Sequence, residues 1–123
     1  MSSKINSCVV RYLEAIASRD SAEIAALYAA DATVEDPAGG PVRTGIGEIE
    51  DFYKALESVD GIKAELITVR STQDTAVFHF TVTTTFGGQQ TVIDPIDVMT
   101  FDSDLKITSM KAYWSEENVV QVD

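Results

Sequence analysis

Apolar positions follow helical spacing in the first part of the chain and strand alternation in most of the rest. Residues 3–18 carry an apolar side chain at every third or fourth position, which predicts a first helix. A second helix is expected from residue 21 to about 30, and a third over residues 45–56. Between these two, residues 32–36 alternate as a short strand, which Pro37 ends because proline cannot donate to a strand ladder.

The second part of the chain alternates as β-strands separated by turn residues such as Gly87-Gly88. The expected strands cover residues 63–71, 75–86, 89–102 and 106–116. Three helices followed by such a meander predict an α+β fold, in which the helices cover the concave face of a curved, mostly antiparallel sheet and enclose an apolar pocket. A chain of 123 residues has the size of one domain, so a single domain over residues 1–123 is expected.

The stretch over residues 92–101 places one carboxyl group among apolar side chains. Alternation along a strand puts Asp97 on the same face as Pro95 and Met99, and no other residue on that face is polar. A carboxylate there loses its hydration, which raises its pKa and favours the neutral acid, a hydrogen-bond donor. The competing interpretation is an aspartate that faces solvent at a sheet edge or pairs with a buried cation.

Two further polar side chains are expected to face the same pocket. Tyr12 lies in the apolar stripe of the first helix, where a buried phenol needs a hydrogen-bond partner, although a core tyrosine bonded to a carbonyl gives the same pattern. Asp36 shares the inward face of its strand with Val34, whereas Glu35 points away. If these side chains converge with Asp97, Asp36 could take a proton from a carbon next to a carbonyl while the two donors hydrogen-bond the enolate oxygen.

The net charge makes a neutral or weakly polar ligand the easiest partner to expect. The net charge is −11, from 9 basic and 20 acidic residues, which argues against nucleic acid and anionic membranes. The one histidine, His79, is expected on the outer face of its strand, so neither a metal site nor a histidine-based triad is predicted. The one cysteine, Cys8, and the lack of a signal-like or membrane-spanning apolar run favour a cytoplasmic location.

Several stretches, in chain order, resemble the bacterial Δ5-3-ketosteroid isomerases of the nuclear-transport-factor-2-like (NTF2-like, SnoaL-like) superfamily. They are Arg11-Tyr12, YAADATVEDP at 28–37, Phe52-Tyr53, IDVM at 96–99 and AYWSE at 112–116. The resemblance implies a cone-shaped α+β fold and movement of the C5=C6 double bond of a 3-oxosteroid to C4=C5. It also implies a homodimer and a reaction without metal or organic cofactor.

The same resemblance implies roles for individual residues. Asp36 would carry a proton from C4 to C6 of the steroid through a dienolate, and Tyr12 and protonated Asp97 would form the oxyanion hole. The expected substrate-binding set comprises Tyr28, Phe52, Tyr53, Phe80, Phe86, Met99, Met110 and Trp114. Within it, Tyr28 and Tyr53 match tyrosines that extend a hydrogen-bond network behind Tyr12 in some members, Trp114 matches an aromatic that orients the base, and the others would line the apolar walls. The loop around Gly39 and the Gly87-Gly88 hairpin match less well, which leaves the substrate preference open.

Two other classes of function fit the same fold, because fold alone does not settle activity. One is another enzyme of the superfamily, such as a cyclase, dehydratase or epoxide hydrolase. Dehydratase members generally have a histidine in the pocket, whereas His79 is expected to face outward. The other is a non-catalytic protein that binds hydrophobic ligands. In a protein of that class, we would expect Tyr12, Asp36 or Asp97 to be replaced, and all three are present.

Overall fold

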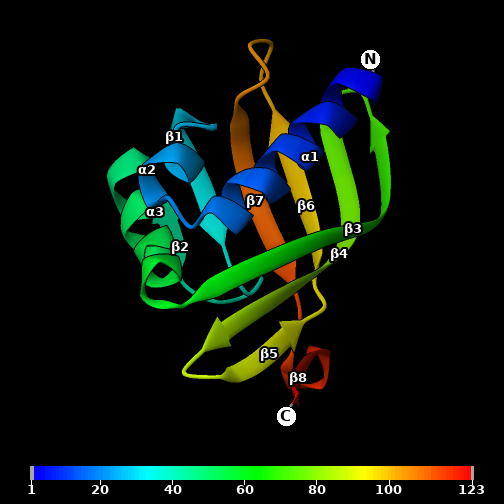
Figure 1. The fold of residues 1–123 in the computed structure, drawn as a ribbon. Helices are drawn as coiled ribbons and strands as arrows, with labels where there is room; N and C mark the ends of the chain where they lie inside the picture. The colour runs from blue at the N-terminus through cyan, green and yellow to red at the C-terminus, as the bar shows by residue number, and fades with distance from the viewer. Residues whose placement is uncertain (1, 123) are drawn as a thin grey trace.

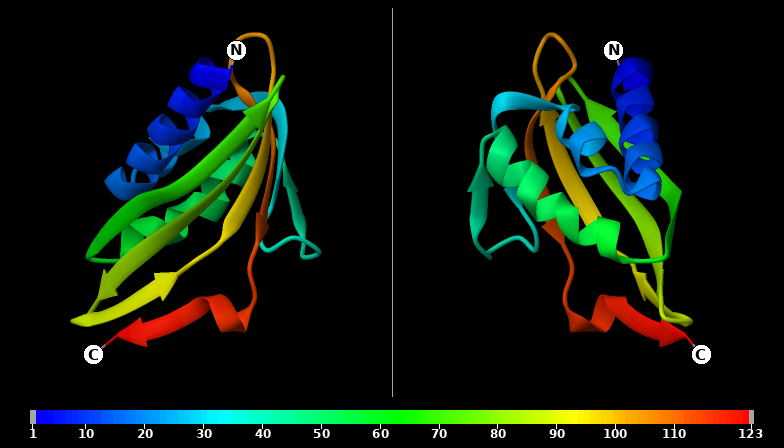
Figure 2. Two further views of the ribbon diagram at one scale, coloured as in Figure 1. Left: turned by 90° about the vertical axis from the view of Figure 1, so that its right-hand side faces the viewer. Right: turned by 60° about the vertical axis from the view of Figure 1, so that its left-hand side comes forward.

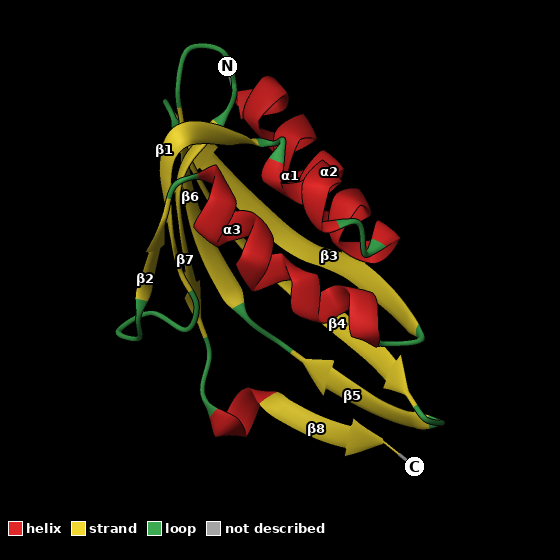
Figure 3. Ribbon diagram, turned by 90° about the vertical axis from the view of Figure 1, so that its left-hand side faces the viewer, coloured by secondary structure: helices red, strands yellow, loops and turns green. Residues whose placement is uncertain are grey.

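The computed structural model describes residues 2–122, in which three helices lie on one face of a curved sheet (Figures 1 and 2). The helical elements are α1 (Ser2–Ser18), α2 (Ser21–Ala25), α3 (Ile46–Tyr53) and a 3₁₀ turn, η1 (Lys54–Ser58). α1 packs on β3 (Gly61–Thr72) and β4 (Thr75–Phe86), and α3 packs on α2 and the opposite end of the sheet (Figure 3). This arrangement confirms the predicted α+β fold.

The second helix is shorter than predicted. It begins where the carboxylate of Asp20 accepts hydrogen bonds from the backbone N–H groups of Ala22 and Glu23, a normal N-cap. The prediction that it continues to about residue 30 is wrong, because the chain from Tyr28 onward is strand β1 (Tyr28–Glu35) and pairs with β7 (Ile107–Tyr113). Tertiary strand pairing here overrides the local helical pattern.

The eight strands form one sheet in the order β2-β1-β7-β6-β4-β5-β8, with β3 also paired to β4. Only the β1–β7 pair is parallel among these described pairs. The remaining strands are β2 (Val42–Thr44), β5 (Gln89–Ile93), β6 (Ile96–Phe101) and β8 (Val119–Val122), and a 3₁₀ turn, η2 (Glu116–Asn118), precedes β8. β2 and β8 were not predicted, because both are short and mostly exposed.

The strand predicted over residues 89–102 is two strands, β5 and β6, separated at Asp94-Pro95. Pro95 has no N–H to donate, and its carbonyl accepts a 3.3 Å hydrogen bond from the backbone of Phe80. The Asp94 N–H instead donates to the carbonyl of Asn118 at 3.0 Å, so β5 leaves the line of β6 and pairs with β8. The predicted face survives the break, since Pro95, Asp97 and Met99 are all buried.

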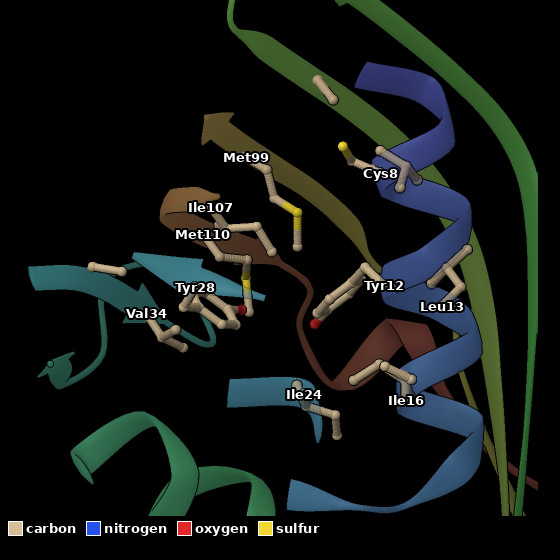
Figure 4. Packing of buried hydrophobic residues seen from close by; sticks show 14 of the residues in the cluster. Cys8, Tyr12, Leu13, Ile16, Ile24, Tyr28, Val34, Met99, Ile107 and Met110 are labelled. Carbon is tan, nitrogen blue, oxygen red and sulfur yellow. The ribbon is translucent and has the colours of Figure 1, made fainter. Parts of the chain in front are cut away.

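The core lies between the helices and the concave face of the sheet (Figure 4). Tyr12 extends from α1 toward the strands that carry Met99, Met110 and Tyr28 (Figure 4). Residues of this layer bury large apolar side chains, and Asp97, 1% exposed, lies among them. No helix in residues 2–122 has the length and apolar character needed to cross a membrane.

Candidate active site

A cavity of about 260 Å³ opens between the helical layer and the sheet. Its polar lining comes from α1, β1, α3, β4, β6 and β7 or the residues directly after them: Tyr12, Asp36, Tyr53, Thr84, Asp97 and Trp114. The apolar lining comprises Ile16, Phe52, Ala55, Leu56, Phe80, Val82, Ile93, Pro95, Ala112. The cavity is therefore a mostly hydrophobic space in which a few polar groups meet, the usual form of a small-molecule site.

Asp97 enters the cavity from the middle of the sheet. On β6 it pairs with Phe78 of β4 and Ala112 of β7, which are apolar neighbours on both sides. Burial raises the pKa of its carboxyl well above the usual value, and the negative charge of Asp36 raises it further. Oδ1 of Asp97 is buried without a hydrogen-bond partner in residues 2–122. A neutral acid in this position has an unused polar group facing a ligand space.

Three tyrosine hydroxyls form a chain that reaches the cavity. The Tyr28 hydroxyl lies 2.7 Å from that of Tyr53, which lies 3.0 Å from that of Tyr12. Burial is the main cause that raises the pKa of each phenol well above its usual value, so all three remain protonated at neutral pH. If each hydroxyl donates to the next toward Tyr12, the proton of Tyr12 is left free for a ligand in the cavity.

Asp36 follows directly after β1 and has a different environment from Asp97. Burial raises the pKa of its carboxyl, but two interactions oppose that rise. The indole Nε1 of Trp114 donates a 2.6 Å hydrogen bond to Oδ1, and the positive charge of Arg43 favours the carboxylate. Two carboxyl groups therefore share one cavity, and only Asp36 has a donor and a cation that favour its charged form. Such divergent surroundings are typical of acid–base pairs.

The structure brings together most of the residues selected from the sequence. Tyr12, Asp36, Asp97, Phe52, Tyr53, Phe80 and Trp114 line the cavity. Tyr28 is behind them and is connected through Tyr53. Met99 and Met110 are core residues, 0% and 1% exposed, that do not line the cavity. Phe86 is 63% exposed and lies outside it.

Two polar residues near the site, Thr84 and Arg43, were not selected from the sequence. Thr84 lines the cavity, and its signal was available, because it alternates with Phe80 and Val82 on β4. Arg43 lies on the short strand β2, which has no readable pattern. His79 contacts Asp94 through Nε2 and does not line the cavity. In residues 2–122, no group of three or more His, Cys, Asp or Glu side chains is arranged to hold a metal ion.

Comparison with known proteins identifies the family and the fold of the chain. Residues 9–110 match the family model of the SnoaL-like domain. The chain is 49% identical over 120 residues to a Steroid Delta-isomerase from Nocardioides simplex, covering 98% of this chain and 97% of the relative. A solved structure of the epoxide hydrolase/cyclase-like enzyme SalBIII, which acts in pyran ring formation in salinomycin, superposes with a TM-score of 0.88. That structure is 21% identical, with 96% of this chain and 95% of the other covered, so it supports the fold alone.

Proposed function

The chain belongs to the SnoaL-like domain family, and on that premise we propose that it is a steroid Δ5-3-ketosteroid isomerase. The observation that carries the proposal is the pair of carboxyl groups in one apolar cavity. Trp114 and Arg43 favour the carboxylate of Asp36, whereas Asp97 is buried without a partner for Oδ1. One group suits a general base, and the other suits a hydrogen-bond donor.

In the proposed reaction, the carboxylate of Asp36 removes a proton from C4 of a 3-oxo-Δ5-steroid. The electron pair of the broken C–H bond delocalises into the C3 carbonyl, which gives a dienolate conjugated with the C5=C6 double bond. Asp36 then returns the proton to C6, and the double bond ends at C4=C5. The proton and the electrons balance within the substrate, so the step uses no cofactor.

Tyr12 and the neutral carboxyl of Asp97 would donate hydrogen bonds to the C3 oxygen as negative charge develops there. Ketosteroid isomerases are themselves the standard example of a neutral carboxylic acid in this role. The tyrosine chain supports the proposal, because the Tyr53 hydroxyl at 3.0 Å can donate to Tyr12 and leave its proton for the substrate. The apolar walls formed by Phe52, Phe80 and Val82 suit a flat hydrocarbon skeleton.

The test is the absorbance of the conjugated enone that forms when the protein is mixed with a Δ5-3-ketosteroid. The unmodified protein is expected to turn over, and Asp36→Asn is expected to lose about a hundredfold to ten-thousandfold in kcat. Asp36→Asn should still bind a phenolic steroid, since the cavity walls are unchanged. Binding without turnover in the unmodified protein would indicate a binding protein or a different substrate. Near-native turnover of Asp36→Asn would reject its role as the base.

We also propose a homodimer formed through the convex face of the sheet. Neighbouring strands there expose Val77, Ile96 and Tyr113, which are 42%, 44% and 50% exposed. Exposed apolar residues on adjacent strands are typical of an interaction surface. Sedimentation should give a dimer at micromolar concentration, and Ile96→Glu should favour the monomer. A monomer alone in the unmodified protein would contradict this proposal.

A further inference from the structure

Arg43 lies on the same face of the sheet as Asp36, although the two residues belong to different segments. In the β1–β2 pair, Arg43 is opposite Val34, which is 0% exposed on the concave face. Side chains that are directly opposite share a face, and Asp36, two residues after Val34, also lines the cavity on that face. Asp36 is the first residue beyond the β1–β2 pairing, which ends at Glu35, and its carboxyl interacts electrostatically with Arg43.

The guanidinium of Arg43 stacks on the ring of Phe52, which lines the cavity. Its Cζ lies 4.5 Å from the centroid of the Phe52 ring, a cation–π contact. In residues 2–122, no carboxylate oxygen forms an ion pair with Arg43 within 4.0 Å. The stacked ring fixes the position of the charge while leaving it without an ion-pair partner.

Other charged groups around Asp36 do not supply this positive charge. On its own segment, Glu35 points to the opposite face and accepts from the backbone of Gly39. From β7, the exposed Lys111 is opposite Glu35 and shares that outer face. The groups that face Asp36 from α1 and β6 are Tyr12 and Asp97, a phenol and an acid.

The neighbouring helical segments carry mostly acids, and their one lysine, Lys54, is paired with Asp51. α3 carries Glu48, bonded to the Thr44 N–H, together with Glu50 and with Asp51, which pairs with Lys54. The 3₁₀ turn after Trp114 carries Glu116 and Glu117. In a protein of net charge −11, such acidic groups disfavour a negative charge on Asp36. Arg43 has the opposite effect and lowers the pKa of Asp36.

We propose that Arg43 is a positioning residue for the general base: stacked on Phe52, it holds a positive charge beside Asp36 and keeps that carboxyl ionised inside the apolar cavity. The consequence for catalysis rests on the proposed isomerase function. The effect on the charge of Asp36 does not depend on any reaction, so the two can be tested separately.

Trp114 gives a direct readout of Asp36, because it is the only tryptophan of the chain and its indole donates to Oδ1 of Asp36. Its fluorescence is therefore expected to change as Asp36 takes up a proton. The titration is measured in the full-length protein without ligand. Asp36→Asn identifies the transition that belongs to this carboxyl, since the variant must lack it.

Arg43→Gln is expected to move the fluorescence midpoint to higher pH, with an increase in proton affinity of about twofold or more. Arg43→Lys keeps the charge and should retain a midpoint closer to that of the unmodified protein. Arg70→Gln is the matched control, because it removes the same charge from an exposed residue of β3 that does not line the cavity. A midpoint in Arg43→Gln equal to that in Arg70→Gln would overturn the proposal.

The pH dependence of kcat/KM provides a second test of the proposal. Below the midpoint, Arg43→Gln should have a lower kcat/KM because more of its Asp36 is protonated, and above both midpoints it should approach the unmodified protein. An equal loss at every pH would mean that Arg43 only supports the wall at Phe52, and would overturn the proposal. If the protein does not isomerise ketosteroids, the proposed function fails, while the fluorescence titration still decides whether Arg43 controls the charge of Asp36.

Discussion

The indole of Trp114 donates a 2.6 Å hydrogen bond to Oδ1 of Asp36. The two residues are 78 positions apart, and the parallel pairing of β1 with β7 brings their segments together. The backbone also connects them, since the N–H of Ala38 donates to the carbonyl of Ala112 at 2.7 Å. This contact distinguishes the two acids of the cavity, because a donor that bonds a carboxylate favours its charged form.

Trp114→Phe is expected to raise the pKa of Asp36, because the variant removes the hydrogen bond that opposes the effect of burial. The acidic limb of the kcat/KM profile should therefore move to higher pH, with the loss of activity largest below the midpoint. At high pH, where Asp36 is ionised in both proteins, the rates should converge. A pH-independent loss would instead assign Trp114 to substrate packing.

Asp97 should make the stability of the protein depend on pH. Its carboxyl has a pKa of about 3.9 in the unfolded chain and a raised pKa in the folded protein. Its contribution to stability is thus complete below the unfolded pKa and is lost as pH rises toward the folded pKa, by at most about 1.4 kcal/mol per pH unit. Urea unfolding should find Asp97→Asn increasingly favoured over the unmodified protein between pH 5 and pH 8. A stability difference that is constant with pH would contradict a raised pKa.

Tyr53→Phe should destabilise the fold and weaken catalysis. Tyr53 is the middle of the hydroxyl chain, so its loss leaves the hydroxyls of Tyr12 and Tyr28 each without the bond they share with it. Burying unpartnered hydroxyl groups costs about 1–3 kcal/mol each, an upper bound where water enters. Denaturant unfolding measures the cost. Thr72→Val, which removes the hydroxyl of an exposed residue of β3, is the control and should change stability little; equal effects of the two variants would argue against the buried chain.

Phe80 and Phe86 provide a matched pair on β4. Phe80 lines the cavity, whereas Phe86 is 63% exposed and lies outside it. Phe80→Ala is expected to raise KM for a steroid substrate and to cost about 3–5 kcal/mol of stability as a buried aromatic. Phe86→Ala should leave KM within about twofold, since an exposed side chain away from such features has little effect. A large effect of Phe86→Ala on KM would mean that substrate extends past the cavity edge.

The placement of Tyr12, Asp36 and Asp97 could be predicted because each lies in a regular local pattern. A helical stripe or strict alternation assigns a side chain to the buried face regardless of how the rest of the chain folds. The expected face of Asp97 held even though the strand breaks at Asp94-Pro95, since the alternation continues through the break. Local pattern therefore determined the direction of the three key groups.

Contacts between distant segments could not be predicted in this way. The position of Tyr53 between two hydroxyls depends on how α3 sits against α1 and β1, and the inward face of Arg43 depends on the register of β2. The position of Phe86 outside the cavity could not be predicted for a related reason. Alternation gives the face of a strand residue, but it does not tell how far along the strand the cavity extends.

The break at Asp94-Pro95 divides the cavity wall into two parts that lie on different strand pairs. Asp97 lies on β6, which pairs with β4, and Ala112 lies on β7, which pairs with β1 and β6. Val82, Thr84 and Ile93 lie beyond the break, on the β4–β5 pair that β8 borders. Substitutions in this distal wall can alter which molecule fits without disturbing the strand registers that hold the proposed acid and base. Related proteins could therefore bind different ligands while keeping the same proposed proton-transfer residues.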